Sequence, residues 1–131
     1  AIIEVTEDCD MDCPVCYAKA GPNAGKHRDL ATIERMLDAL VESEGNPDVV
    51  QIGGGEPTRH PEILEILAQA KRRPIRHLML DTNGLRLARD PDFAARLKDF
   101  TPGFEVYLQF DTLEHNPTKL NRKGIPLFAE M

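Results

Sequence analysis

Apolar residues recur along the chain with two alternating periods, one typical of strands and one typical of helices. Short runs of apolar and β-branched residues occupy positions 1–5, 49–52, 75–80 and 104–110, and their length and composition predict four strands. Between these runs, apolar residues repeat three and four positions apart, which places them on one face of a helix. The pattern therefore predicts strands that alternate with helices.

Three helices are expected between the strands. The first begins near Leu30 and ends before Gly45, a residue that favours helix termination. The second is expected to carry Pro61 at its first position, where the amide that proline lacks would have no helical partner. The third begins with Asp90 as its N-cap and Pro91 as its first residue. The apolar residues expected to face the core are Leu30, Ile33, Met36, Leu37, Leu40, Val41, Ile63, Leu64, Ile66, Leu67, Ala70, Phe93, Ala94, Leu97 and Phe100.

Alternating strands and helices with short connections indicate parallel βαβ units. The chain contains about three and a half such units, roughly half of a (β/α) barrel. We therefore expect an α/β fold in which residues 1–131 form the N-terminal part of a partial barrel, a single domain. The sequence starts inside a strand at Ala1 and stops at Met131 within a helical pattern, so we expect both ends to be cut or processed.

The composition excludes several classes of function. With 41% hydrophobic and 29% charged residues the chain has the make-up of a soluble globular domain. The net charge is −6 and no basic run is present, so no nucleic-acid partner is expected. No apolar run approaches the length that spans a bilayer, so we expect no membrane contact and a cytoplasmic location.

All three cysteines of the chain lie within eight residues, in the spacing C-x3-C-x2-C. Cys9, Cys13 and Cys16 follow the first predicted strand, and α/β folds place their chemistry on such loops. A disulfide would leave one cysteine over and would link two residues very close in sequence. A structural zinc site needs a fourth ligand. The histidines that could supply it are His27, His60, His77 and His115.

None of these histidines stands in the paired spacing that zinc fingers use, and we expect all four in loops and on the surface. A [4Fe–4S] cluster prefers thiolate ligands, and a ferredoxin supplies four of them. Three cysteines would leave one iron open to a substrate or cofactor. The cysteines alone favour a cluster over zinc but leave both possible. Most of the acidic residues around them are expected to be solvated: Glu4, Glu7, Asp8, Asp10 and Asp12.

Polar or glycine-rich stretches also follow the other three strands. Gly53-Gly54-Gly55-Glu56-Pro57 follows the second, and its glycines would let the backbone approach a ligand closely. It lacks the lysine and Ser/Thr of a P-loop, and an ordinary turn remains the alternative. Thr82-Asn83-Gly84 follows the third strand and also fits a turn. Gln109 and Asp111, two apart, share a face of the fourth strand; simple filling of a barrel interior is equally possible for them.

Together, the cysteine spacing, the GGEP stretch at 54–57 and the TNG stretch at 82–84 resemble the motifs of the radical S-adenosylmethionine (SAM) superfamily, in the same order. The resemblance covers essentially the whole chain. It implies that Cys9, Cys13 and Cys16 ligate a [4Fe–4S] cluster whose fourth iron binds the amine and carboxylate of SAM. It also implies a set of residues that bind SAM, among which Val15 lies beside the adenine. These residues are Val15, Gly54, Gly55, Glu56, Asn83, Gln109 and Asp111.

The resemblance implies an enzyme that cleaves SAM reductively to a 5′-deoxyadenosyl radical, which abstracts hydrogen from an unknown substrate. The electron would come from an external donor of the flavodoxin or ferredoxin type. The residues that form the motifs resemble those of the molybdenum-cofactor (MoaA) branch, which includes pterin methyltransferases and tetraether lipid synthases. Family members usually continue for two more strand–helix units, so these 131 residues alone are expected to be inactive toward a substrate. A non-catalytic zinc or iron–sulfur module is the alternative.

Overall fold

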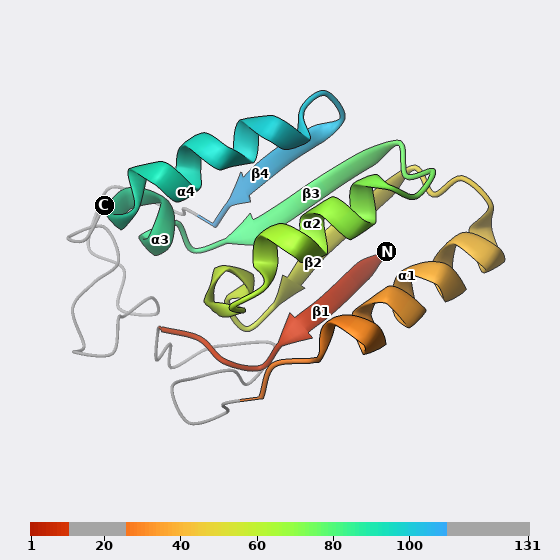
Figure 1. Ribbon diagram of the computed structural model, residues 1–131, viewed down its shortest axis with the longest axis horizontal. Helices are drawn as coiled ribbons and strands as arrows, with labels where there is room; N and C mark the ends of the chain where they lie inside the picture. The colour runs from red at the N-terminus through yellow and green to blue at the C-terminus, as the bar shows by residue number, and fades with distance from the viewer. Residues whose placement is uncertain (11–25, 110–131) are drawn as a thin grey trace.

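The computed structural model describes residues 1–10 and 26–109 (Figure 1). The strands of this part are β1 (Ile2–Thr6), β2 (Val49–Gly54), β3 (His77–Thr82) and β4 (Phe104–Leu108). Its α-helices are α1 (Leu30–Glu44), α2 (Ile63–Lys71), α3 (Leu85–Arg89) and α4 (Pro91–Arg96), and its 3₁₀ helices are η1 (Pro57–Arg59) and η2 (Leu97–Phe100). No helix in the described ranges has both the length and the apolar composition needed to cross a bilayer.

The strands form one sheet in the order β1-β2-β3-β4, and all three pairings are parallel. Neighbours along the chain are therefore neighbours in the sheet, as in a run of βαβ units. Because the strands run the same way, their C-terminal ends lie at one edge of the sheet (Figure 1). The predicted α/β architecture, with parallel strands alternating with helices, is confirmed.

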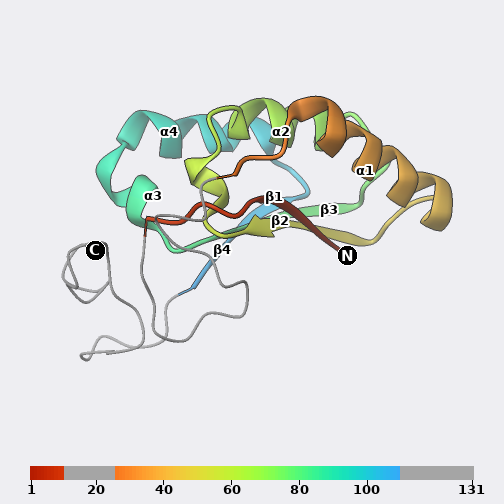
Figure 2. The same cartoon turned by 90° about the horizontal axis from the view of Figure 1, so that it is seen from below.

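Helices α1, α2 and α4 lie together on one face of the sheet (Figure 2). Alternate strand residues point into this layer, so that β3 buries Leu78 and Leu80 while His77 and Met79 stay partly exposed. The buried residues that form the core are Ile3, Val5, Ile33, Leu37, Val50, Ile52, Ile63, Ile66, Leu67, Ala70, Leu78, Leu80, Phe93 and Leu97. Most of the residues predicted to face the core do so.

The opposite face of the sheet is not covered by any helix of the described residues (Figure 2). It carries large apolar side chains that are strongly exposed: Ile2 and Tyr107 are each 53% accessible and Val49 is 40% accessible. In a closed (β/α) barrel this face would be the interior.

Some predicted boundaries are wrong. The third strand is His77–Thr82, not 75–80, because the Arg76 amide already bonds the Pro47 carbonyl, outside the strand ladder. Helix α2 begins at Ile63 rather than at Pro61. Pro57 takes the first helical position instead, in the unpredicted η1.

Other predicted ends are confirmed. Asp90 caps α4, since its Oδ1 accepts a hydrogen bond from the Phe93 amide at 3.0 Å. Gly45 ends α1 with a φ of 76°, a left-handed conformation that glycine adopts without strain. Helix α3, only five residues long, was not predicted, because a single turn shows too little periodicity to be recognised.

Candidate functional site

The described members of the predicted site all lie at the C-terminal edge of the sheet. Cys9 follows β1, Gly54 ends β2 and is followed by Glu56, Asn83 follows β3, and Gln109 follows β4. Their strands are adjacent and parallel, so four strand ends far apart in sequence lie at this edge (Figure 1). Four predicted residues lie outside the described residues, and their roles stay predictions: Cys13, Val15, Cys16 and Asp111.

Gly54, which ends β2, and Gly55 lie against the backbone that leads into the segment of the three cysteines (residues 9–16, the cysteine loop). The Gly55 amide donates to the Thr6 carbonyl at 2.7 Å, and the Glu56 amide donates to the Asp8 carbonyl at 2.8 Å. A Cβ on Gly54 would clash with the Thr6 carbonyl oxygen, and one on Gly55 with that of Asp8. Gly54 also has a φ of 130°, which side chains rarely allow. These glycines thus permit a close approach to Thr6 and Asp8, which lie just before Cys9.

Glu56 is buried beneath this edge, with 2% of its surface exposed. Its Oε1 accepts hydrogen bonds from the Thr58 amide at 3.2 Å and from the Thr58 and Thr82 hydroxyls at 2.6 Å each. Its Oε2 accepts from the Asn83 amide at 2.7 Å. Burial raises the pKa of the Glu56 carboxyl, and these hydrogen bonds oppose the rise. Glu56 therefore joins the end of β2 to the end of β3, and its SAM contact stays a prediction.

Asn83 continues this connection to the cysteine loop. Its side-chain Nδ2 donates to Asp10 Oδ1 at 2.8 Å, and its Oδ1 accepts from the Leu85 amide at 3.0 Å. Together with the bond from its own amide to Glu56, these contacts fix both the backbone and the side chain of Asn83. The loop after β3 thus holds the residue that follows Cys9.

Asp8 is an exception among the acidic residues, most of which were expected to be solvated. Glu4 and Glu7 are exposed, as expected, but Asp8 is only 6% exposed. Its Oδ2 lies 2.9 Å from Arg59 Nε, in η1, and this cation compensates for the burial of the carboxylate. The loop after β2 therefore holds the residue that precedes Cys9.

The histidine prediction is wrong at two positions, because His77 begins β3 instead of lying in a loop and His60 is not on the surface. His60 is 2% exposed. Its Nδ1 accepts from the Glu62 amide at 3.0 Å, which leaves Nε2 to donate to the Arg28 carbonyl at 2.6 Å. With both ring nitrogens engaged, His60 is a structural residue and not a metal ligand. Within residues 1–10 and 26–109, no group of three or more His, Cys, Asp or Glu side chains could hold a metal ion.

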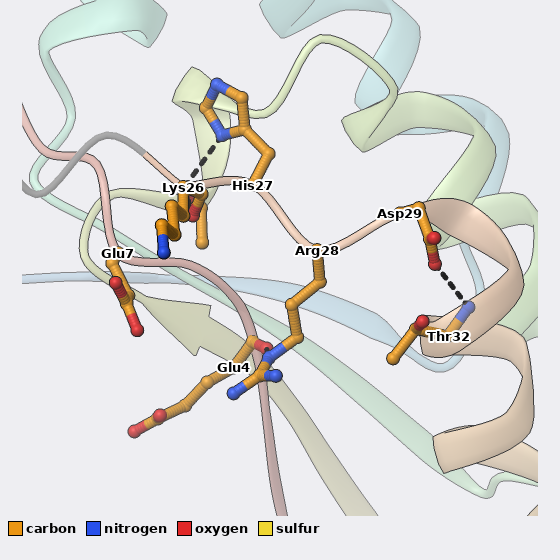
Figure 3. A pocket seen from close by; sticks show the side chains of 8 residues that line it. Glu4, Glu7, Lys26, His27, Arg28, Asp29 and Thr32 are labelled. Carbon is orange, nitrogen blue, oxygen red and sulfur yellow. Dashed lines mark hydrogen bonds between the residues drawn. The ribbon is translucent and has the colours of Figure 1, made fainter.

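A pocket of about 260 Å³ lies beside β1, and its lining residues are shown in Figure 3. Segment 26–28 forms one wall, because the Arg28 amide bonds the Val5 carbonyl and the Glu7 amide bonds the Lys26 carbonyl, at 2.9 Å each. The residues that line the pocket are Glu4, Thr6, Glu7, Lys26, His27, Arg28, Asp29 and Thr32. They include both signs of charge and none of the predicted site residues, so the pocket favours no particular ligand.

Asp81 is a candidate that the sequence analysis missed. It lies on β3, on the open face, beside Tyr107 in the register of β4. Its Oδ1 is buried and has no hydrogen-bond partner, and burial raises the pKa of this carboxyl. Strand alternation could have indicated it, since Asp81 and Met79 share a face with Gln51 of β2. A buried acceptor without a donor marks a position where a ligand can bind.

Comparison with known proteins agrees with this geometry. The family model of the Radical SAM superfamily matches residues 3–127. The chain is 31% identical over 119 residues to the 7,8-dihydro-6-hydroxymethylpterin dimethyltransferase of Methanocaldococcus jannaschii, a match that covers 89% of this chain and 23% of that protein. It is 32% identical over 120 residues to the GTP 3′,8-cyclase of Peptoclostridium acidaminophilum, covering 89% of this chain and 35% of that one.

Solved structures share the fold. A histidine-tagged form of anSMEcpe with bound AdoMet superposes with a TM-score of 0.73 at 21% identity, over 98% of this chain and 36% of that one. The chain therefore spans about a quarter to a third of the length of the proteins it matches here. The likeness at this level of identity concerns the arrangement of strands and helices.

Proposed function

Because the chain belongs to the Radical SAM superfamily, we propose that it holds a [4Fe–4S] cluster through Cys9, Cys13 and Cys16 and binds SAM beside it. The donor set fits the cluster, since three thiolates leave one iron for the amine and carboxylate of SAM. When bound, the pair supplies a 5′-deoxyadenosyl radical after one-electron reduction, by chemistry that belongs to the cofactor. The protein's contribution is to bind, orient and shield it.

One observation supports this proposal most directly: the loops after β2 and β3 converge on the two residues that flank Cys9. Arg59 contacts Asp8 and Asn83 contacts Asp10. These contacts hold Cys9 in place without the metal, which would lower the entropic cost of binding for this one ligand. An ordinary turn would need no such support.

For SAM binding we propose Val15, Gly54, Gly55, Glu56, Asn83, Gln109 and Asp111. The Glu56 carboxylate accepts most of its hydrogen bonds from donors within the protein. Its contribution is therefore to hold the Gly55 backbone and the Asn83 loop in position. Gln109 is bonded to β3 through its backbone amide, which donates to the Thr82 carbonyl at 2.9 Å. Asp81 adds an acceptor on the open face for an amine or hydroxyl group of SAM or substrate.

The names of the relatives suggest the class of substrate. They include a pterin dimethyltransferase and a GTP cyclase, so we propose a role in cofactor, pterin or lipid modification, with an electron donor of the flavodoxin or ferredoxin type. We further propose that the protein works in the cytoplasm, where iron–sulfur chemistry and reduced cysteines are compatible.

Anaerobic reconstitution with iron and sulfide, followed by a SAM-cleavage assay, tests the proposal. We expect a brown protein with broad absorption near about 400 nm that releases 5′-deoxyadenosine when reduced. The variant lacking all three cysteines is the control and should do neither. A colourless chain that takes up zinc instead would contradict the proposal and support the non-catalytic alternative.

A further inference from the structure

The residues on either side of Cys9 are each held by a different loop. Asp8 forms an ion pair with Arg59, from the loop after β2, and Asp10 accepts a hydrogen bond from Asn83, from the loop after β3. Both contacts join segments more than fifty positions apart in sequence. Cys9 therefore lies between two fixed points.

The Asp8 side is fixed at three atoms. Its amide donates to Thr6 Oγ1 at 3.0 Å, its carbonyl accepts from the Glu56 amide at 2.8 Å, and its carboxylate meets Arg59 Nε at 2.9 Å. The Asp8 side chain is 9% exposed and that of Arg59 is 39% exposed. The carboxylate is therefore poorly hydrated, and Arg59 is a cation that lies against it.

The Asp10 side depends on a donor that is itself fixed. The backbone amide of Asn83 bonds Glu56, and its side-chain oxygen bonds the Leu85 amide. These two bonds orient the remaining Nδ2 group, which donates to Asp10 Oδ1. This arrangement holds the chain on the far side of Cys9.

We propose, on the basis of the proposed function, that Arg59 and Asn83 are positioning residues that hold Cys9 for the cluster, and that Arg59 also sets the charge beside it. The opposite charges of Asp8 and Arg59 have a consequence for the reduction potential of the cluster. Negative charge near an anionic cluster lowers its reduction potential, and positive charge raises it. The Asp8–Arg59 pair is nearly neutral as a unit, so removing either member alone shifts the potential, in opposite directions.

The test is a reductive titration of the reconstituted full chain, followed by electron paramagnetic resonance (EPR). R59Q leaves the Asp8 charge uncompensated by Arg59 and should lower the midpoint potential. D8N removes the negative charge of Asp8 and keeps the positive charge of Arg59, so it should raise the midpoint potential. The double variant should return close to the unaltered chain, and R59K, which keeps the cation, should shift the potential least of the Arg59 variants.

The matched control is R73Q. Arg73, just after α2, forms an ion pair of similar length, 2.8 Å from the exposed Asp38 of α1, away from the cysteines. R73Q should lower the thermal midpoint of the protein without changing the reduction potential. N83A, which removes the other contact, should reduce the iron content reached on reconstitution.

The outcomes separate this inference from the proposed function. Opposite shifts for R59Q and D8N, with restoration in the double variant, would support the inference. Shifts of the same sign, no shift, or an equal shift for R73Q would overturn it while leaving the cluster assignment intact. An unaltered chain that assembles no cluster would overturn both.

Discussion

At the scale of single residues, Gly55 and Glu56 occupy positions that few other residues could occupy. Gly55 lies against the Asp8 backbone so closely that even a methyl group has no room. Glu56 provides four hydrogen-bond contacts from a position almost without solvent. Both residues support the cysteine loop or its neighbours, so their effects should appear in cluster assembly before they appear in SAM binding.

Gly55→Ala should therefore impair the cluster itself. The new Cβ would push the Asp8 carbonyl away from β2, and we expect a destabilisation of roughly 1–3 kcal/mol together with a lower iron content after reconstitution. Gly53→Ala is the matched control, because its Cβ would meet only ordinary contacts at 3.6 and 3.8 Å. Normal cluster assembly in Gly55→Ala, with only SAM binding weakened, would show that the ligand rather than the cysteine loop requires the glycine.

The cysteines allow a second prediction at this scale. The chain has three and no spare, so Cys9→Ala, Cys13→Ala and Cys16→Ala should each prevent formation of a stable four-iron cluster. Iron and sulfide analysis after anaerobic reconstitution measures this directly. A full complement in any one of the three variants would contradict the assignment of that residue as a ligand.

At the scale of elements, the connections between strand ends matter more than the strands themselves. Glu56 links β2 to β3, Asn83 links β3 to the loop after β1, and Arg59 links η1 to the same loop. These bonds run across the C-terminal edge of the sheet, from one strand end to the next. They connect the ends of β2 and β3 to the two residues on either side of Cys9.

Glu56→Gln tests the link between β2 and β3. Because the folded-state pKa of Glu56 is raised, the folded chain binds the proton more tightly than the unfolded chain. The contribution of Glu56 to the free energy of unfolding is therefore full below the usual value of 4.5 and declines as the pH rises through the folded-state pKa. The difference in stability between the unaltered chain and Glu56→Gln should accordingly shrink as the pH rises.

Urea unfolding at several pH values between about 4 and 8 measures this difference. Glu42→Gln, at an exposed position on α1, is the control and should show no comparable trend. If the difference grew with pH, the hydrogen bonds to the carboxylate would outweigh its burial, contrary to the raised pKa.

The sequence predicted the elements well and their connections poorly. Alternating apolar runs are local features, so the strands, the helices and the core face of helix residues such as Leu37 and Leu67 could be predicted. The burial of Asp8 and His60 depends on partners far away, Arg59 and Arg28. Nothing in the local pattern indicates which distant residue meets which. Asp81 differs from these two residues, because the alternation along β3 could have indicated it.

At the scale of the whole molecule, the sheet is asymmetric. One face is covered by α1, α2 and α4, and the other is open (Figure 2). Within the described residues β4 pairs only with β3, and its Tyr107 and Leu108 are 53% and 40% exposed. An unpaired strand edge with apolar side chains is a template for association between chains.

We therefore expect the 131-residue chain to self-associate as its concentration rises, with the edge of β4 involved. Tyr107→Lys should reduce this association, because a charge at a strand edge opposes pairing. Val49→Lys, an equally charged change at an exposed position on the central strand β2, is the control. Light scattering across a concentration series measures the effect, and equal behaviour of the two variants would exclude the β4 edge as the contact.

The central claim is that Cys9, Cys13 and Cys16 hold a cluster whose open iron binds SAM. Low-temperature EPR of the reduced, reconstituted chain, with and without SAM, tests it most directly. We expect the signal of a [4Fe–4S] cluster, about four irons per chain, and a change in its g values when SAM is added. A chain that holds no such cluster, or a spectrum that SAM leaves unchanged, would contradict the claim.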